Sequence, residues 1–213
     1  MAIIFGKSGE DSLIGTSADD SIWGFAGDDY LNGQGGDDDL MGGLGNDVLW
    51  GDIGEDNLNG GLDNDQLFGS HHHDILNGND GDDELFGGHG QDSLTGGAGA
   101  DTFVVNTIHY VGTPDSTVAE PDYITDFSHA EGDRIDVSLL DANEGLSRNQ
   151  AFSFIGNRAF TGVAGQLRYE VINLKPGYTD YTRVTGDMDG DGVADFQINA
   201  AGQIAFVAAD FVL

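Results

Sequence analysis

A nine-residue spacing runs through the first half of this chain and constrains its fold more than any other feature. From Gly6 to Val104 the sequence divides into eleven consecutive units of nine residues with no insertion. Position 1 of every unit is glycine, and position 8 is a large apolar residue, from Leu13 in the first unit to Phe103 in the last. Position 6 is always aspartate: Asp11, Asp20, Asp29, Asp38, Asp47, Asp56, Asp65, Asp74, Asp83, Asp92 and Asp101. Three fixed positions through eleven units indicate stacked copies of one structural element rather than a solubilising loop.

The residue types at the fixed positions favour a parallel β-roll. Glycine permits positive φ and close backbone approach, so positions 1–6 are expected to form a turn. Positions 7–9 then form a short strand in which only the middle side chain points inward. Two units make one coil, with the turns of odd and even units along opposite edges. The sequence predicts an all-β fold in which a right-handed parallel β-roll occupies residues 1–104.

Charge indicates that cations are the partner of this roll. The chain of 213 residues has 38 acidic and 7 basic side chains, a net charge of -31, which disfavours nucleic acid and anionic membranes. The segment from Gly6 to Val104 holds 22 acidic residues, 24 glycines and one basic residue, Lys7. Repulsion and glycine entropy both oppose folding, so we expect it to be largely unfolded without cations. Hard oxygen ligands favour Ca²⁺ over zinc or copper.

The unit Gly-Gly-x-Gly-x-Asp-x-apolar-x resembles the calcium-binding nonapeptide of the repeats-in-toxin (RTX) family. The resemblance implies that each Ca²⁺ lies between the turns of units n and n+2, on one edge. The earlier turn would supply carbonyls at positions 2 and 4, the later turn carbonyls at positions 1 and 3, and both turns the aspartate. Eleven turns allow at most nine such sites.

Carried over to this sequence, the RTX arrangement gives three example sites. They are Phe25, Gly27 and Asp29 with Gly42, Leu44 and Asp47; Gln34, Gly36 and Asp38 with Gly51, Ile53 and Asp56; and Asn79, Gly81 and Asp83 with Gly96, Ala98 and Asp101.

Three units depart from the pattern because position 4 is Ala18, Asp63 or His72 instead of glycine. Asp and His tolerate a left-handed backbone better than Ala, so the second, seventh and eighth turns are expected to bind more weakly or to lose a site. The eighth turn also contains His71, His72 and His73. Neighbouring imidazoles suit a transition metal or a pH sensor, but consecutive residues rarely converge on one ion, so we favour an altered, exposed turn.

After Val104 the period stops, and alternating stretches such as Leu167–Val171 and Phe196–Ile198 predict half-buried strands. We expect residues 105–213 to form a β-sandwich-like cap on the roll. Six segments resemble the serralysin C-terminal domain: Gly96–Val104, Asp122–Phe127, Asp133–Asp136, Ala159–Gly162, Ala164–Tyr169 and Gly190–Phe196. The resemblance implies a non-catalytic region exported through a type I ABC-transporter channel.

The last four residues, Asp210, Phe211, Val212 and Leu213, are similar to the uncleaved secretion signal of that family. The N-terminal segment has no basic region ahead of its short apolar patch and is not a cleaved signal peptide. The expected location is therefore extracellular, reached through the C-terminal signal.

A second cation site is possible at Asp187, Asp189, Asp191 and Asp195, whose spacing resembles an EF-hand loop. The acid expected at loop position 12 is replaced by Ile198, so a hairpin turn without metal is an equal alternative.

The sequence predicts no enzyme activity. A serralysin would carry His-Glu-x-x-His, and none of the six histidines lies in such a motif. Two function classes stay open: a stand-alone secreted calcium-binding protein, or the C-terminal module of a larger secreted enzyme (metallopeptidase, lipase or mannuronan epimerase), with carbohydrate binding possible in the second case.

Overall fold

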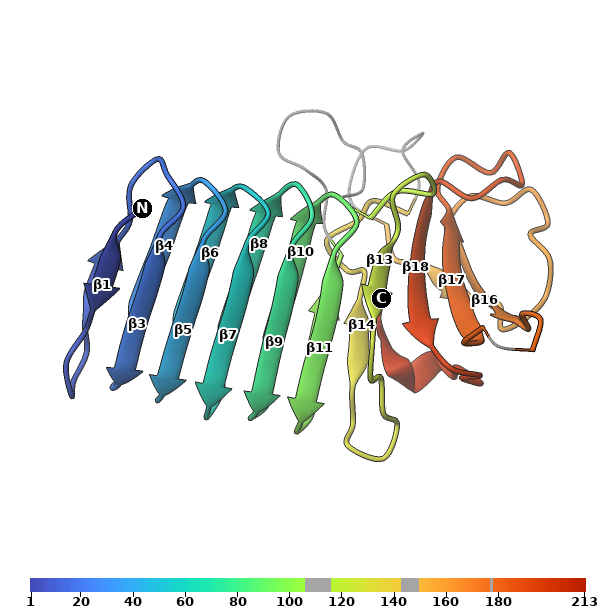
Figure 1. Cartoon of the computed structure of the whole chain (residues 1–213). Helices are drawn as coiled ribbons and strands as arrows, with labels where there is room; N and C mark the ends of the chain where they lie inside the picture. Colours follow the sequence, from blue (N-terminus) through green and yellow to red (C-terminus); the bar gives the residue numbers. More distant parts are fainter. Residues whose placement is uncertain (106–115, 143–149, 177) are drawn as a thin grey trace.

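The computed structural model of the chain describes residues 1–105, 116–142, 150–176 and 178–213. Strands alternate between two sheets as the chain winds through successive coils, which stack along one axis (Figure 1). The first sheet receives β1 (Ile3–Phe5), β3 (Ser21–Ala26), β5 (Asp39–Leu44), β7 (Asn57–Leu62), β9 (Ile75–Asp80) and β11 (Ser93–Ala98). The second receives β2 (Ser12–Ile14), β4 (Tyr30–Gly35), β6 (Val48–Ile53), β8 (Gln66–His71), β10 (Glu84–His89) and β12 (Thr102–Val104). The predicted parallel β-roll is confirmed.

The core of the roll is one ladder of position 8 side chains in each sheet. Parallel neighbours pair with a shift of two units, so Leu40 lies beside Leu58 and Leu49 beside Leu67. Ten of these residues are at most 3 % exposed: Ile22, Leu31, Leu40, Leu49, Leu58, Leu67, Leu76, Leu85, Leu94 and Phe103. Leu13, in the first unit, is only partly buried. Two thin rows of apolar side chains therefore form the interior, as the period predicts.

The strands are longer than the three residues expected from the sequence. From β3 to β11 each strand has six residues, because it continues through positions 1–3 of the following unit. Ladder bonds such as that from the Gly27 N–H to the Leu44 carbonyl (2.8 Å) hold these positions to the next coil. The reversal of direction is concentrated at positions 4 and 5.

Two backbone positions in each turn have positive φ, which explains the glycine content. In units 3 to 11, position 2 is left-handed whether it is glycine (Gly43, φ 123°) or not (Gln34, φ 75°). Position 4 is also left-handed in these units, including Asp63 (φ 74°) and His72 (φ 79°). Asp63 and His72 thus keep the common turn geometry, whereas Ala18 does not adopt positive φ.

The strands after Val104 continue the two sheets of the roll. In the first sheet β13 (Asp122–Ile124) follows β11, and β18 (Phe196–Ala201), β17 (Tyr181–Asp187), β16 (Gln166–Ile172) and β15 (Ser153–Phe154) follow it outward (Figure 1). In the second sheet β14 (Arg134–Asp136) and then β19 (Phe211–Val212) follow β12. Pairing is antiparallel from β16 to β17 and from β17 to β18.

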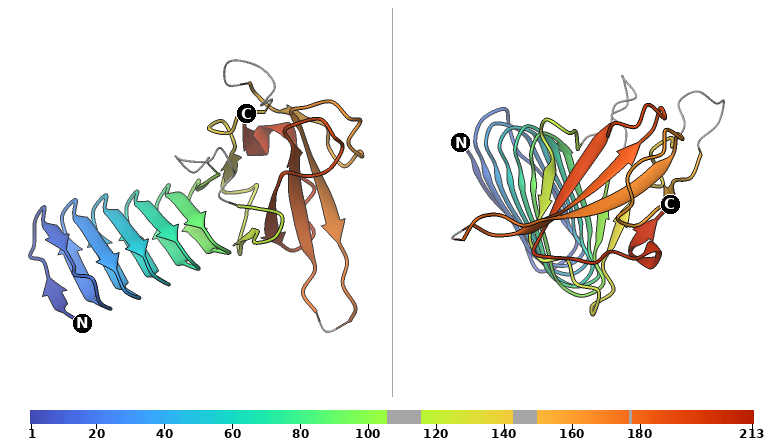
Figure 2. Two further views of the ribbon diagram at one scale, coloured as in Figure 1. Left: turned by 90° about the horizontal axis from the view of Figure 1, so that it is seen from above. Right: turned by 90° about the vertical axis from the view of Figure 1, so that its right-hand side faces the viewer.

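This continuation does not confirm a β-sandwich-like cap over 105–213, because the described strands extend existing sheets rather than form a second sheet pair. Figure 2 shows the hairpin of β16 and β17 turned away from the roll axis beyond its last coil. A short 3₁₀ helix, η1 (Ala208–Asp210), leads into β19. Among the described residues, the structure contains no helix of the length and apolar character needed to cross a membrane.

Candidate metal centres

The position 6 aspartates form a continuous ladder along each edge of the roll. From Asp29 onward, the Oδ1 atom of each aspartate accepts a hydrogen bond from the backbone N–H of the aspartate one coil earlier, at 2.7–3.0 Å. The Asp47 N–H donates to Asp65, for example, and the Asp65 N–H donates to Asp83. Each carboxylate thus fastens two adjacent turns together.

The second oxygen of the same carboxylates is buried without a partner. Nine Oδ2 atoms have no hydrogen-bond partner among the described residues: those of Asp29, Asp38, Asp47, Asp56, Asp65, Asp74, Asp83, Asp92 and Asp101. These residues are at most 2 % exposed. A buried, unpaired carboxylate oxygen is strongly unfavourable, so a cation is the natural complement to this row.

Further oxygen atoms lie beside these orphaned oxygens. A Cβ built on Gly78 would lie 2.1 Å from Oδ2 of Asp83 and 2.7 Å from the carbonyl oxygen of Gly96. The same arrangement holds one unit earlier on the other edge, where a Cβ on Gly69 would lie 2.4 Å from Asp74 Oδ2 and 2.5 Å from the Gly87 carbonyl. Glycine at position 1 therefore leaves the space in which an aspartate and the position 1 carbonyl of the next coil approach each other. This donor set of carboxylate and carbonyl oxygens fits Ca²⁺.

The structure brings the predicted turn pairs together. The position 4 N–H of the earlier turn bonds the position 3 carbonyl of the later turn in all three examples: Gly27 to Leu44 (2.8 Å), Gly36 to Ile53 (2.9 Å) and Gly81 to Ala98 (2.9 Å). Each carbonyl keeps its second lone pair. Ligation by the predicted atoms of Phe25, Gln34, Gly42, Gly51 and Asn79 stays a prediction.

Burial makes the repeat aspartates weak acids in the metal-free chain. It raises the pKa of Asp65 and Asp74 to about 8, with neighbouring carboxylates adding to the effect. It raises the pKa of Asp38 and Asp101 to about 7 in the same way. Desolvation and like charges both disfavour the carboxylate, so a cation that binds this row would displace protons from it.

The first two turns differ from the other nine. Oδ2 of Asp11 accepts the Lys7 N–H (2.5 Å), and Oδ2 of Asp20 accepts the Thr16 N–H (2.6 Å) and the Thr16 hydroxyl (2.8 Å). The chain itself therefore occupies the oxygens that are unpaired from Asp29 onward.

Sequence reasoning missed that the ladder continues beyond the repeat. Oδ1 of Asp122 accepts the Asp92 N–H (3.1 Å), and Oδ1 of Asp133 accepts the Asp101 N–H (3.2 Å). Asp126 adds a two-oxygen contact, with Oδ1 bonded to the Gly96 N–H (3.1 Å) and Oδ2 to the Gly97 N–H (2.9 Å). Asp122-Tyr-Ile and Asp133-Arg-Ile repeat the Asp-x-apolar order of positions 6–8, which is the signal that could have identified them.

A second ladder at position 5 gives His73 a structural role. Side chains at this position accept the position 5 N–H of the next coil on the same edge, as Asn64 does from Asp82 (2.9 Å) and Asp82 from Ala100 (2.8 Å). In the eighth turn His73 takes this place, with its Nδ1 accepting the Gln91 N–H (2.8 Å).

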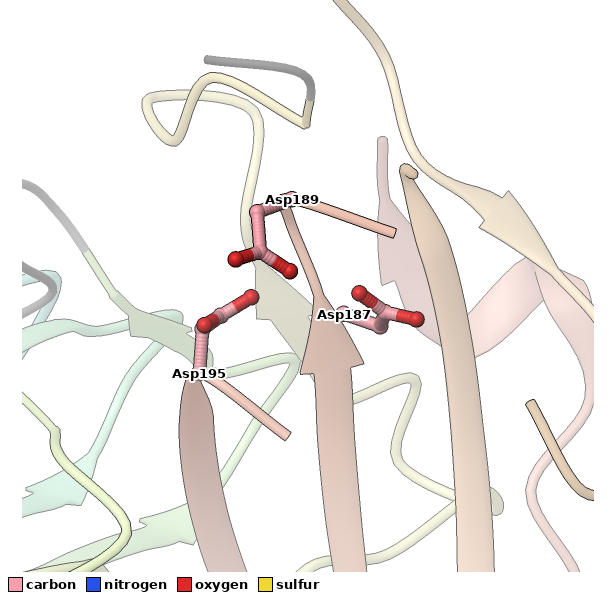
Figure 3. A group of neighbouring side chains, drawn as sticks. All are labelled: Asp187, Asp189 and Asp195. Carbon is pink, nitrogen blue, oxygen red and sulfur yellow. The ribbon is translucent and has the colours of Figure 1, made fainter. Parts of the chain in front are cut away.

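Three of the four acids in the EF-hand-like stretch come together. Carboxylate oxygens of Asp187, Asp189 and Asp195 lie within 4.8 Å of one another (Figure 3). Asp187 is fully buried and accepts the Gly190 N–H (2.7 Å) and Gly192 N–H (3.1 Å). Asp191 is exposed and lies outside the group. The backbone bonds satisfy both oxygens of Asp187, so the loop is held as a turn by its own acids.

Two of the four predicted export residues, Phe211 and Val212, form β19 at the edge of the second sheet. Phe211 of β19 lies beside Ile135 of β14 and is 7 % exposed. Oδ1 of Asp210 lies 2.9 Å from Nδ1 of His129. Val212 and Leu213 are half-buried.

Comparison with known proteins gives one family and several structural neighbours. The R3 subunit of the Azotobacter vinelandii mannuronan C5-epimerase AlgE6 is 23 % identical, with 97 % of this chain and 80 % of that chain covered and a TM-score of 0.39. The R2 subunit is 24 % identical, with 99 % and 91 % covered and a TM-score of 0.35. No curated protein matches the chain. The profile described as "Peptidase M10 serralysin C terminal" spans residues 2–213, and the chain therefore belongs to the serralysin C-terminal family, with its RTX-type β-roll.

Proposed function

We propose that this chain is a secreted, non-catalytic calcium-binding protein whose roll folds when Ca²⁺ fills its turns. The observation that carries the proposal is the row of nine orphaned Oδ2 atoms along the two edges of the roll. Only a ligand that accepts electron density from oxygen satisfies these atoms without a change of sequence, and Ca²⁺ prefers carboxylate and carbonyl donors.

When bound, Ca²⁺ supplies positive charge and a flexible shell of oxygen ligands. The chain's own residues do the remaining work. The aspartate Oδ1 atoms join neighbouring coils, so the stacking of coils itself fixes the position of the carboxylates. The left-handed turn positions let backbone groups of adjacent coils pair, as where the Gly36 N–H donates to the Ile53 carbonyl. Ion binding and coil stacking are therefore the same event.

Extracellular calcium modules bind with dissociation constants of about 10⁻⁴–10⁻³ M, well above cytosolic calcium. The chain would then stay unfolded inside the cell and fold after export. Circular dichroism during a calcium titration tests this: we expect a transition from coil to β-structure with Ca²⁺, and a much weaker response to Mg²⁺ at the same concentration. A chelator-treated chain that is already rich in strand, and that calcium leaves unchanged, would contradict the proposal.

We further propose export by a type I ABC transporter that recognises Asp210, Phe211, Val212 and Leu213. The transporter would bind these residues while the chain is still unfolded, before Phe211 pairs with β14 in the folded sheet. Deletion of the four residues is expected to abolish secretion in a host with such a transporter. The His129→Ala variant is the matched control, because it removes the contact to Asp210 in the folded protein and keeps the signal. Equal secretion of the deletion variant and the parent would exclude the signal.

Membership in a family defined by a peptidase C-terminal region favours a second candidate, a module of a larger secreted enzyme such as a metallopeptidase, a lipase or a mannuronan epimerase. The upstream reading frame distinguishes the two.

Carbohydrate binding would require exposed aromatic ring faces. The structure reveals an aromatic row on the outer face of the second sheet, where Trp50 stacks on Phe68 (4.0 Å between centroids) and Phe68 on Phe86 (4.4 Å). The rings of this row cover one another's faces by stacking. The row therefore stabilises the stack of coils, and mainly ring edges are left for contact with a sugar. A glycan array in the presence of calcium tests the remaining possibility.

A further inference from the structure

The fold gathers histidines that are distant in sequence on the edge formed by the even-numbered turns. A hollow of about 440 Å³ opens there, and its walls include His71, His72 and His73 of the eighth turn, His89 of the tenth turn and Glu120 of the following loop. His71, His72 and Glu120 are exposed, and His89 is half-buried.

His71 and His89 are direct neighbours across the sheet. They are the last residues of β8 and β10, and the parallel register places one beside the other. Their rings stack with centroids 5.1 Å apart and an interplanar angle of 10°. The roll therefore creates an imidazole pair by placing adjacent coils in register, which three consecutive histidines alone would not do.

His73 does not join this pair. Its Nδ1 lone pair accepts the Gln91 N–H, so in the neutral ring the proton is on Nε2 and neither nitrogen has a free lone pair. Two of the three consecutive histidines thus have different roles. His73 joins two coils, whereas His71 stacks on His89 and lines the hollow.

We propose that His71 and His89 bind a borderline transition-metal cation such as Zn²⁺, with Glu120, which lines the same hollow, as a carboxylate ligand. Imidazole with carboxylate suits Zn²⁺, Ni²⁺ and Cu²⁺, whereas Ca²⁺ prefers the all-oxygen row beneath. Among the described residues only Asp187, Asp189 and Asp195 already bring three ligand atoms within 4.8 Å, so His71, His89 and Glu120 complete the site by side-chain rotations. The exposure of His71 and Glu120 leaves their rotations free.

The site is tested by isothermal titration of ZnCl₂ into the full chain with Ca²⁺ in large excess, so that the roll is folded and the oxygen sites are filled. Loss of a residue that merely supports a metal ligand lowers affinity about 10–100-fold, so His71→Ala and His89→Ala are each expected to weaken zinc binding by about tenfold or more. Glu120→Gln should weaken it less.

His73→Asn is the matched control. It removes an imidazole from the same turn but keeps an acceptor for the Gln91 N–H, as Asn46 and Asn64 provide in other turns. Zinc affinity should be unchanged in this variant, and only the ring signals of His71 and His89 should shift in a histidine NMR spectrum. Circular dichroism in calcium confirms that each variant retains its strands. Absence of zinc binding by the folded parent, or full affinity in a folded His71→Ala/His89→Ala double variant, would overturn the proposal.

Discussion

Oδ1 of Asp65 lies 2.8 Å from the backbone nitrogen of Asp47, one coil earlier, while Oδ2 of the same carboxylate is buried without a partner. The first half of this carboxylate, Oδ1, makes a structural hydrogen bond, and the second half, Oδ2, has no hydrogen-bond partner among the described residues. The first half joins coils whether or not an ion is present. The second half opposes folding until a cation arrives, so the two halves can be separated experimentally.

Asp65→Asn is expected to act in opposite directions with and without calcium. An asparagine oxygen still accepts the Asp47 N–H, but the buried charge is lost, so the calcium-free chain should become more stable. In calcium the variant should lose about 1 kcal/mol or more of ion-dependent stabilisation, the contribution of one site at about ten times its dissociation constant. Strand content by circular dichroism in a chelator measures the first effect, and urea unfolding in calcium measures the second. The exposed neighbour Asp63→Asn removes the same charge and should leave the calcium response unchanged.

Acidification should stabilise the calcium-free roll. Burial raises the pKa of Asp65 and Asp74 to about 8, against an ordinary value of 3.8, so the folded chain binds more protons than the unfolded chain between these values. The free energy of unfolding therefore rises as pH falls from about 8 towards 4. This added stability disappears when the pH rises through the pKa of the two aspartates in the folded chain. Circular dichroism in a chelator should show more strand at pH 5 than at pH 8. With calcium the trend should reverse, because protons compete for the ligands.

Gly54→Ala should disrupt the turn of the sixth unit. Gly54 has φ of 150°, and an added Cβ would lie 1.9 Å from the carbonyl oxygen of Gly36 on the adjacent coil. We expect a loss of about 2 kcal/mol or more in calcium, measured by thermal unfolding, since the backbone of two coils must move apart. Gly9→Ala is the comparison, because a Cβ there meets nothing within 4 Å. Similar losses in the two variants would mean that the turns do not depend on this close approach.

A matched pair on β7 tests the thin core. Leu58 is fully buried, whereas Leu62 on the same strand is 44 % exposed. Leu58→Ala should cost about 2–5 kcal/mol of the free energy of unfolding in calcium. Leu62→Ala should change it by no more than about 0.5 kcal/mol. Chemical denaturation of both variants gives the difference directly, and equal values would contradict the inward orientation of position 8.

The roll was predictable from sequence because every coil repeats the same demands at the same positions. Leucine at position 8, glycine at positions 1 and 4 and aspartate at position 6 each meet one constraint of the coil, as Leu49, Gly51 and Asp56 illustrate. The strand length was underestimated because the glycines at positions 1–3 read as a turn, although their backbone groups are paired to the next coil.

Contacts that join segments of irregular spacing were not predictable. Asp122 and Asp133 enter the aspartate ladder 30 and 32 residues after their partners, in place of the regular 18. The approach of His89 to His71 follows from register, but Glu120 reaches their hollow through a loop with no periodic signal. The sandwich-like cap was not confirmed because alternating strands are equally able to extend a sheet as to start another.

Asp122 and Asp133 also give the roll a built-in starting point. Each presents the same carboxylate that a following coil would offer. Asp122 does so from β13, which pairs with β18, and Asp133 from the residue before β14, which pairs with β19. The last two repeats can therefore dock on a finished edge, and each new coil then becomes the template for the one before it in sequence. Folding of the coils would therefore propagate from the C-terminal repeats towards the N-terminus.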